Sequence, residues 1–93
     1  MRLEINPSTK FRRDYKRIKS RGYDLDLLEQ VVNTLAEEKP LPPENKDHSL
    51  SGNWSGFREC HIQPNWLLIY RVREKELELL LMRTGTHSDL FRE

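Results

Sequence analysis

The segment from Trp66 to Val72 is nearly all apolar, although 33% of the 93 residues in the chain are charged. A run of this kind predicts a central strand that is covered on both faces of a sheet. Strand-like segments flank it at Phe57–Ile62 and Leu77–Met82, and a turn signal at Gln63–Asn65 and a polar stretch at Arg73–Glu76 separate the three. The second half of the chain therefore predicts three consecutive strands of a mostly antiparallel sheet.

The first half of the chain predicts a short strand followed by two helices. Leu3 and Ile5 alternate with polar residues, as in a strand, and Ser8 can cap the helix that follows. The second helix should begin near Asp24 or Asp26. Apolar residues at helical spacing mark one face of each helix: Phe11, Tyr15 and Ile18 in the first, and Leu27, Leu28, Val31, Val32 and Leu35 in the second. Three prolines end the second helix: Pro40, Pro42 and Pro43.

These elements predict one α+β domain over residues 1–93, in the order strand, helix, helix, strand, strand, strand. Few residues join the two helices, so they should form an antiparallel hairpin packed on a mostly antiparallel, four-stranded sheet. The polar stretch from Glu44 to Gly56 is expected to be a loop. No apolar run is long enough for a bilayer, and the start of the chain lacks the apolar stretch of a signal peptide. We therefore expect a cytoplasmic location and no contact with a membrane.

The net charge is only +1, but the charges are unevenly distributed along the chain. Residues 10–21 hold one acid, Asp14, among these cations: Lys10, Arg12, Arg13, Lys16, Arg17, Lys19 and Arg21. Cations clustered on one helix predict a surface that binds nucleic acid. We expect RNA phosphates to be held by Lys10, Arg12, Lys16 and Lys19. The alternative is a solvated helix face without a ligand.

Two kinds of chemistry are disfavoured by the positions of the residues that would perform them. Cys60 is the only cysteine, and His61 beside it should point to the opposite face of a strand. A packed thiol is therefore favoured over a thiol nucleophile. The three histidines are far apart in the chain and form no H-x-H or H-x-x-x-H pair, so we expect neither a metal site nor a cofactor.

The predicted sheet gathers distant polar residues at one end. A tight hairpin centred on Glu74–Lys75 would put Trp66 opposite Arg83, and the preceding turn would bring His61 close to them. His87 follows Arg83 by four residues. A cluster of histidines with an arginine suits the cleavage of RNA, which needs a base, an acid and a cation that stabilises charge on phosphorus.

Each residue of this cluster has a predicted role and a structural alternative. We expect His87 to be the general acid, because histidine titrates near neutral pH, and Arg83 to be the phosphate clamp, because its fork matches phosphate oxygens. Trp66 or Phe91 would stack on an unpaired base. Alternatively, a histidine can be purely structural, Arg83 can be a surface cation, and Trp66 can be a core residue.

Three segments of the second half together resemble one known family. Lys46–His61, Pro64–Tyr70 and Arg83–Phe91 are similar, in order and spacing, to the YafQ branch of the RelE toxin superfamily. The resemblance implies a RelE-like fold and a toxin of a type II toxin–antitoxin system. Such a toxin enters the ribosomal A site, contacts 16S rRNA and cuts messenger RNA without a metal. It also has a cognate antitoxin that covers the active site.

Carried over position by position, the resemblance implies these active-site residues: His48, His61, Trp66, Arg83, His87 and Phe91. The family usually has an aspartate where this chain has Asn65. We therefore expect His48 or His61 to be the general base, with Asn65 orienting a histidine or the RNA. We also expect the toxin–antitoxin complex to be a higher oligomer and the free toxin to be a monomer.

Two functions other than RNA cleavage fit parts of the sequence. One is a toxin relative that binds RNA, the ribosome or an antitoxin without cutting, and Asn65, which lacks a carboxylate, keeps it open. The other is a DNA-binding partner in operator repression. Only the basic helix favours it, and that helix need not be a recognition helix.

Overall fold

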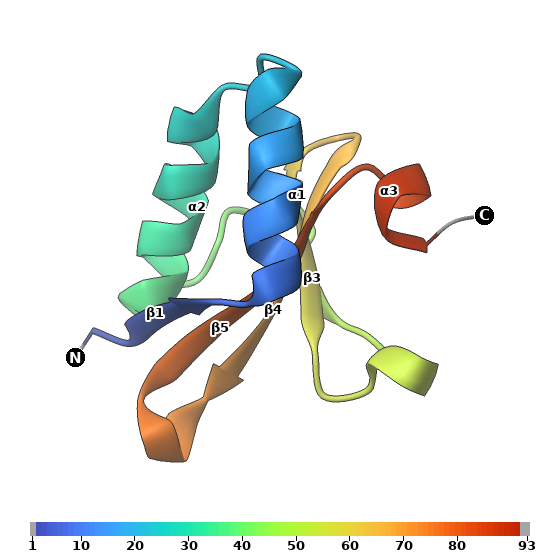
Figure 1. The fold of residues 1–93 in the computed structure, drawn as a ribbon. Coiled ribbons are helices and arrows are strands. Elements are labelled where there is room, and N and C mark those ends of the chain that lie inside the picture. The colour runs from blue at the N-terminus through green and yellow to red at the C-terminus, as the bar shows by residue number, and fades with distance from the viewer. Residues whose placement is uncertain (1, 92–93) are drawn as a thin grey trace.

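A five-stranded mixed sheet, in the strand order β1-β5-β4-β3-β2, forms the centre of the computed structural model, which describes residues 2–91 (Figure 1). The helices and strands follow one another as β1 (Glu4–Pro7), α1 (Thr9–Ser20), α2 (Leu25–Ala36), β2 (His48–Ser49), β3 (Arg58–Gln63), β4 (Trp66–Arg73), β5 (Glu78–Gly85) and α3 (His87–Phe91). In the described part of the chain, β1 pairs with β5 in parallel and the other pairings are antiparallel. No helix within residues 2–91 has the length and apolar character that crossing a membrane requires.

The two long helices begin at capping side chains. Ser8 Oγ accepts a hydrogen bond from the Phe11 backbone N–H at 3.0 Å. Asp24 Oδ1 accepts one from the Asp26 backbone N–H at 3.1 Å. These bonds satisfy N–H groups that the first turn of a helix leaves free. α1 and α2 then lie side by side over one face of the sheet, as predicted for a helix hairpin (Figure 1).

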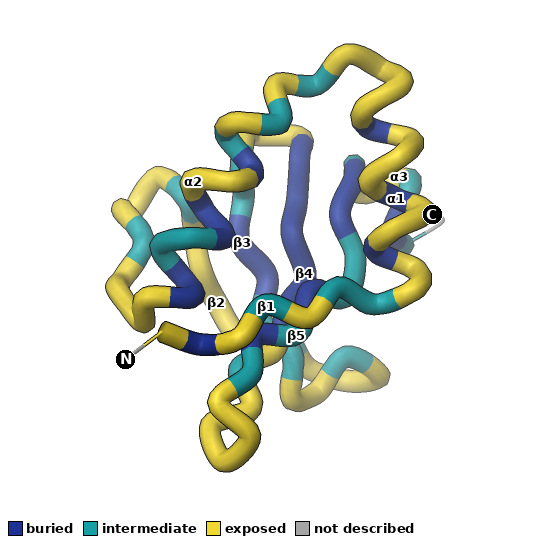
Figure 2. Tube along the Cα trace, turned by 60° about the vertical axis from the view of Figure 1, so that its left-hand side comes forward, coloured by how far each residue is buried: buried dark blue, intermediate teal, exposed yellow. Residues whose placement is uncertain are grey.

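The central strand β4 is buried on both faces, as its apolar sequence predicts. Leu68 and Tyr70 belong to the main core, which the sheet forms with α1 and α2. Leu67 and Ile69 point the other way and form a second, smaller cluster with Leu90 of α3. Figure 2 shows the buried strands in the middle and the exposed outer sides of the helices. The sheet therefore has a helix face, covered by α1 and α2, and a second face, against which α3 packs.

The sheet has five strands, where four were predicted. The additional strand is β2, which lies within the stretch expected to be a loop and pairs His48 with Glu59 and Ser49 with Arg58. Two residues are too few to show the alternation from which a strand is predicted. The same part of the chain also contains two 3-10 turns, at Pro43–Asn45 and Gly52–Trp54.

The predicted register of the β4–β5 hairpin is wrong, because Arg83 lies opposite Ile69 and not opposite Trp66. β1 accompanies β5 only along Glu78–Leu81, so Arg83 lies beyond the paired part of that edge. Its side chain can therefore reach around the edge of the sheet toward α1.

Two local features explain the change of register. The strands are joined by a 3-10 turn at Glu74–Glu76 with Leu77 in a left-handed conformation (φ 51°), where a two-residue turn was assumed. A bulge between Ile69 and Tyr70 then shifts the pairing once more. Neither feature has a strong signal in the sequence, since Glu74–Lys75 resembles no preferred hairpin turn.

Candidate active site

A buried carboxylate lies between two of the predicted site histidines. β2 places His48 opposite Glu59 of β3, and His61 follows two residues later on the same side of that strand. The Oε1 atom of Glu59 lies 3.4 Å from His48 Nε2 and 4.0 Å from His61 Nε2. The Glu59 side chain is 7% exposed, compared with 50% for His48 and 18% for His61. The two rings therefore stand near the surface above a carboxylate that solvent barely reaches.

Backbone carbonyl groups orient both rings through the Nδ1 atom, the ring nitrogen that does not face Glu59. His48 Nδ1 lies 2.7 Å from the Lys46 carbonyl oxygen, and His61 Nδ1 lies 3.2 Å from that of Pro64. Because a carbonyl oxygen only accepts hydrogen bonds, each Nδ1 atom donates and each Nε2 atom is directed toward Glu59. Every nitrogen of the two rings thus has an acceptor near it.

Glu59 is a site residue that sequence reasoning misses. Alternation along the strand puts it on the same side as His61, and that is a usable signal. A charged residue in a strand ordinarily lies on a solvated face, however, and nothing in the sequence indicates that Glu59 is buried. Its contact with His48 depends on the two-residue strand β2, which has no visible pattern.

The third histidine reaches the same face of the sheet from α3. The ring centres of His61 and His87 are 6.3 Å apart. His87 is exposed, and the ring of Phe91, one helical turn later, lies 5.8 Å from its own ring. Trp54 lies 6.3 Å from Phe91 and extends this aromatic surface. The structure thus brings His48, His61 and His87 together on the second face of the sheet, with Phe91 beside them.

Arg83 is held by a buried aspartate of α1. Its Nε atom donates to Asp14 Oδ2 at 2.7 Å and its Nη2 atom donates to Oδ1 at 3.1 Å. Asp14 is 2% exposed and also accepts a hydrogen bond from the Thr84 backbone N–H at 3.1 Å. The hydrogen bonds with Asp14 raise the pKa of Arg83. A guanidinium that is doubly bonded and 17% exposed does not fit the alternative of an ordinary surface cation.

Trp66 lies in the core of the protein, as the structural alternative to its predicted stacking role expects. Its side chain is among the largest that are fully buried, and the residue is 1% exposed. Its Nε1 atom donates to Thr84 Oγ1 at 2.9 Å, and its ring meets that of Tyr23 edge-on at 4.9 Å. Packing therefore accounts for Trp66, whose ring has no face open to RNA here. Phe91 is the residue that keeps the predicted stacking role.

Asn65 is exposed in the turn between β3 and β4. The contact at His61 Nδ1 comes from the carbonyl group of the preceding residue, Pro64. Asn65 is therefore the neighbour, in the chain, of the residue that contacts His61. A contact with RNA stays as its predicted role.

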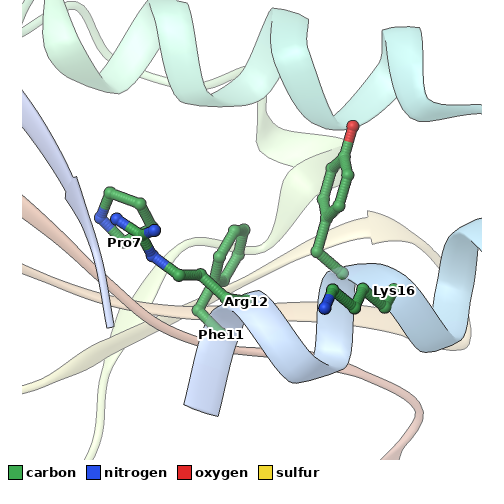
Figure 3. A pocket seen from close by; sticks show the side chains of 5 residues that line it. Pro7, Phe11, Arg12 and Lys16 are labelled. Carbon is green, nitrogen blue, oxygen red and sulfur yellow. The ribbon is translucent and has the colours of Figure 1, made fainter. Parts of the chain in front are cut away.

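The cations predicted to hold RNA are all exposed on α1: Lys10, Arg12, Lys16 and Lys19. Arg12 and Lys16 border a hollow of about 570 Å³ together with Pro7, Phe11 and Tyr15 (Figure 3). Because α1 covers the helix face, these cations and the paired histidines of β2 and β3 lie on opposite sides of the sheet. Any RNA that touches both must extend around the sheet.

Cys60 is a packed thiol, as the sequence predicts. It is fully buried in the main core. Burial raises the pKa of Cys60 to about 12, with further contributions from the charges of Asp47 and Glu59. A thiol in this state has almost no thiolate at neutral pH, so it cannot act as a nucleophile.

Comparison with known proteins places this geometry among bacterial toxins. A family model described as "Bacterial toxin of type II toxin-antitoxin system, YafQ" matches residues 3–92. The mRNA interferase toxin YafQ of Escherichia coli strain K12 is 38% identical over 89 residues, which cover 95% of each chain.

Solved structures agree over nearly the whole chain. A crystal structure of a metal-bound toxin from Helicobacter pylori superimposes with a TM-score of 0.91 and 48% identity, covering 96% of this chain and 99% of the other. A chain in the crystal structure of the E. coli DinJ–YafQ toxin–antitoxin complex superimposes with a TM-score of 0.88 and 37% identity, covering 98% of this chain and 99% of the other.

Proposed function

This chain belongs to the YafQ family of bacterial type II toxins, and from this premise we propose that it is a ribosome-dependent endoribonuclease that cuts messenger RNA in the A site. One observation carries the proposal. Glu59 contacts the rings of His48 and His61, and the ring of His87 lies 6.3 Å from that of His61. Imidazole groups arranged in this way supply an acid and a base on one accessible surface.

The proposed reaction is a transesterification within the RNA chain. A base removes the proton of the 2′-hydroxyl, and the freed oxygen attacks the adjacent phosphorus. The bond from phosphorus to the 5′-oxygen breaks, which leaves a 2′,3′-cyclic phosphate, and an acid protonates the departing oxygen. One proton is taken up and one is released, so imidazole groups can carry the step without a metal or a cofactor.

The structure suggests how the two proton transfers are divided. His87 is exposed on α3 and is proposed to be the acid. His61 or His48 is proposed to be the base, with Glu59 stabilising the imidazolium that forms. The group of two histidines and one carboxylate would hold the proton taken from the 2′-hydroxyl while His87 protonates the leaving oxygen.

The remaining site residues are proposed to bind the RNA. Arg83 would neutralise charge on the phosphate, and Asp14 fixes the plane of its guanidinium. Phe91 would stack on an unpaired base beside His87. The exposed cations of α1 would contact the phosphates of 16S rRNA.

A cognate antitoxin is the proposed protein partner. The similar E. coli chain was crystallised in a DinJ–YafQ toxin–antitoxin complex. By analogy, we expect this chain to form a higher oligomer with its own antitoxin and to be a monomer when free. The proposed place of action is the cytoplasm, since the substrate is messenger RNA on the ribosome.

Asn65 favours a second candidate function. The position lies exposed in the turn beside the site, where the family usually carries a carboxylate. A toxin relative without a competent base would bind RNA, the ribosome or an antitoxin without cutting.

Primer extension on translated messenger RNA after brief induction of the chain tests the first function against the second. We expect cuts at defined positions in the reading frame. Replacing His87 by Ala should slow the cleavage by about 10²–10⁴-fold, because a general acid contributes that much. Lys75→Ala, in the exposed turn between β4 and β5, is the matched control and should cut as the wild type does.

Two outcomes would count against the proposal. Wild-type cleavage by a folded His87→Ala variant would remove His87 from the role of acid. An absence of cuts by the wild type, with ribosome binding retained, would favour the binding function.

A further inference from the structure

Asp89, in the middle of α3, makes two hydrogen bonds with Thr86, the residue that precedes the helix. The Thr86 backbone N–H donates to Asp89 Oδ2 at 3.0 Å, and the Asp89 backbone N–H donates to Thr86 Oγ1 at 3.1 Å. This reciprocal pair closes the first turn of the helix in the manner of a capping box. The carboxylate of Asp89 is thereby fixed relative to His87, which lies between the two residues.

The same carboxylate ties α3 to the carboxyl end of α1. Arg21 donates from Nη1 to Asp89 Oδ2 at 2.7 Å and from Nη2 to Oδ1 at 3.1 Å. Arg17 Nη1 lies 3.6 Å from Asp89 Oδ1. The hydrogen bonds from Arg21 and Thr86 hold the pKa of Asp89 well below its ordinary value, so the carboxylate is charged at neutral pH. A bidentate bond of an arginine fork with a carboxylate fixes direction as well as distance.

The contacts continue from Asp89 to the proposed phosphate clamp. Arg17 Nη1 also lies 3.9 Å from Asp14 Oδ1, and Asp14 holds Arg83. One polar hollow of about 380 Å³ is lined by Arg17, Arg21, Arg83 and Asp89, together with Ser88 and Leu90. α1 therefore holds the last residues of β5 through Asp14 in its middle, and α3 through Arg17 and Arg21 at its carboxyl end.

α3 needs such an anchor because it is only five residues long. Helices of this length are unstable without tertiary contacts. Leu90 is its buried residue, whereas His87 is exposed. The backbone before it is built around the Asp89 carboxylate: Gly85 has φ +151°, and a Cβ atom there would lie 2.8 Å from Asp89 Oδ2. The glycine at position 85 therefore leaves room for the Asp89 carboxylate, which a larger side chain there would displace.

We propose that the Arg21–Asp89 pair positions His87 for catalysis by pinning α3 to the end of α1. The pair touches neither the substrate nor the reacting atoms. It keeps the imidazole of His87 beside that of His61, so that the proposed acid stays close to the proposed base. The inference rests on the proposed function only for the consequence on cleavage, since the pinning itself can be measured without RNA.

Two variants separate the pinning from capping and from RNA binding. Asp89→Asn keeps the shape of the side chain and an oxygen that accepts the hydrogen bond from the Thr86 backbone N–H. It loses the negative charge that pairs with Arg21. Arg21→Gln breaks the same pair from the other helix. Arg73→Gln is the matched control, because Arg73 makes ion pairs with Glu76 and Glu78 at the turn between β4 and β5. Arg21→Lys keeps the charge and should retain part of the effect.

The first measurement is made on the free toxin by NMR. We expect amide hydrogen exchange at residues 88–91 to become about three- to tenfold faster in Asp89→Asn and Arg21→Gln, as loss of a bidentate, partly exposed pair implies. The imidazole resonances of His87 and His61 should also shift. Arg73→Gln should leave exchange in α3 and both imidazoles unchanged. Unchanged exchange in both variants would overturn the proposal.

The second measurement is cleavage on ribosomes, with the ribosome concentration varied. We expect the rate at saturation to fall by about tenfold or more in both variants, because small misplacement of a catalytic group is costly. Asp89→Asn removes no cation, so weaker RNA binding cannot explain its loss. A normal saturated rate with faster exchange in α3 would overturn the positioning role. A wild type that does not cleave would refute the proposed function, while exchange and the imidazole shifts would still decide whether α3 is pinned.

Discussion

At the scale of the residue, Glu59 changes what is expected of Asn65. Position 65 lacks the carboxylate that the family usually has, and it lies exposed in the turn between β3 and β4. Glu59 supplies a buried carboxylate, whose Oε1 atom lies 3.4 Å from His48 Nε2 and 4.0 Å from His61 Nε2. The proposed base, formed by these three groups, needs no second carboxylate in the turn. The missing aspartate therefore does not by itself argue against catalysis.

Asn65→Asp is expected to change the cleavage rate by less than about tenfold, which is 1.4 kcal/mol in barrier height. The reason is that the histidines already have a carboxylate partner. Single-turnover cleavage on ribosomes measures the rate, and Asn65→Ala separates a missing charge from a missing hydrogen bond. A gain of about a hundredfold or more in Asn65→Asp would show that the native chain lacks a needed base, and it would favour the binding function.

At the scale of the element, α1 has three sides that make different contacts. Phe11 and Ile18 face the main core. Asp14 reaches the end of β5, and Arg21 reaches α3. The outward side carries the remaining cations, and part of it borders the hollow in Figure 3. The same helix therefore contacts the proposed site and also presents cations to solvent.

Reversing Arg12, Lys16 and Lys19 to Glu is expected to weaken binding to the ribosome and to flatten its dependence on salt. Phosphate contacts release counterions, so fewer contacts mean a smaller salt slope. Binding is measured by sedimentation with ribosomes across a salt series. The control reverses Arg2, Lys39 and Lys75, which changes the net charge equally on other surfaces. Equal effects of the two triple variants would mean that the outward side of α1 is only a solvated face.

The elements that could be predicted are those whose pattern is long enough to read. Period-3.6 stripes and capping residues predict α1 and α2, and a continuous apolar run predicts that β4 is central. The two-residue strand β2 shows no period, and the turn at Glu74–Glu76 with the following bulge has no distinctive residues. Because the pairing of His48 with Glu59 depends on β2, the carboxylate of the site was also beyond what local pattern can show.

At the scale of the whole molecule, the site combines groups from both layers of the fold. His48 and His61 stand on the second face of the sheet, whereas Asp14 and Arg21 belong to the helix layer. The layers meet at the edge of β5 beyond β1, where Arg83 and Asp89 connect them. The proposed acid, base and clamp therefore depend on the assembled domain and not on one loop.

Cleavage is expected to be independent of added metal, because histidine and arginine side chains can supply the acid, the base and the phosphate contact. A related toxin from Helicobacter pylori is described as metal-bound, and imidazole and carboxylate groups are ligands that zinc and copper accept, so the expectation needs a direct test. Purified ribosomes treated with a zinc chelator, with magnesium retained for the ribosome, should support normal cleavage. Activity that disappears and returns on adding zinc would contradict this expectation.

The sheet ends in a short strand on each side. β1 has four residues and closes with Pro7, which has no N–H group to donate. β2 has two residues, and next to it Asn45 Nδ2 donates to the His61 carbonyl oxygen at 2.7 Å. A long exposed edge strand is a template on which other chains add and aggregate. With both edge strands this short, neither offers a long template for such addition, which favours a protein that stays dispersed when it is released from a partner.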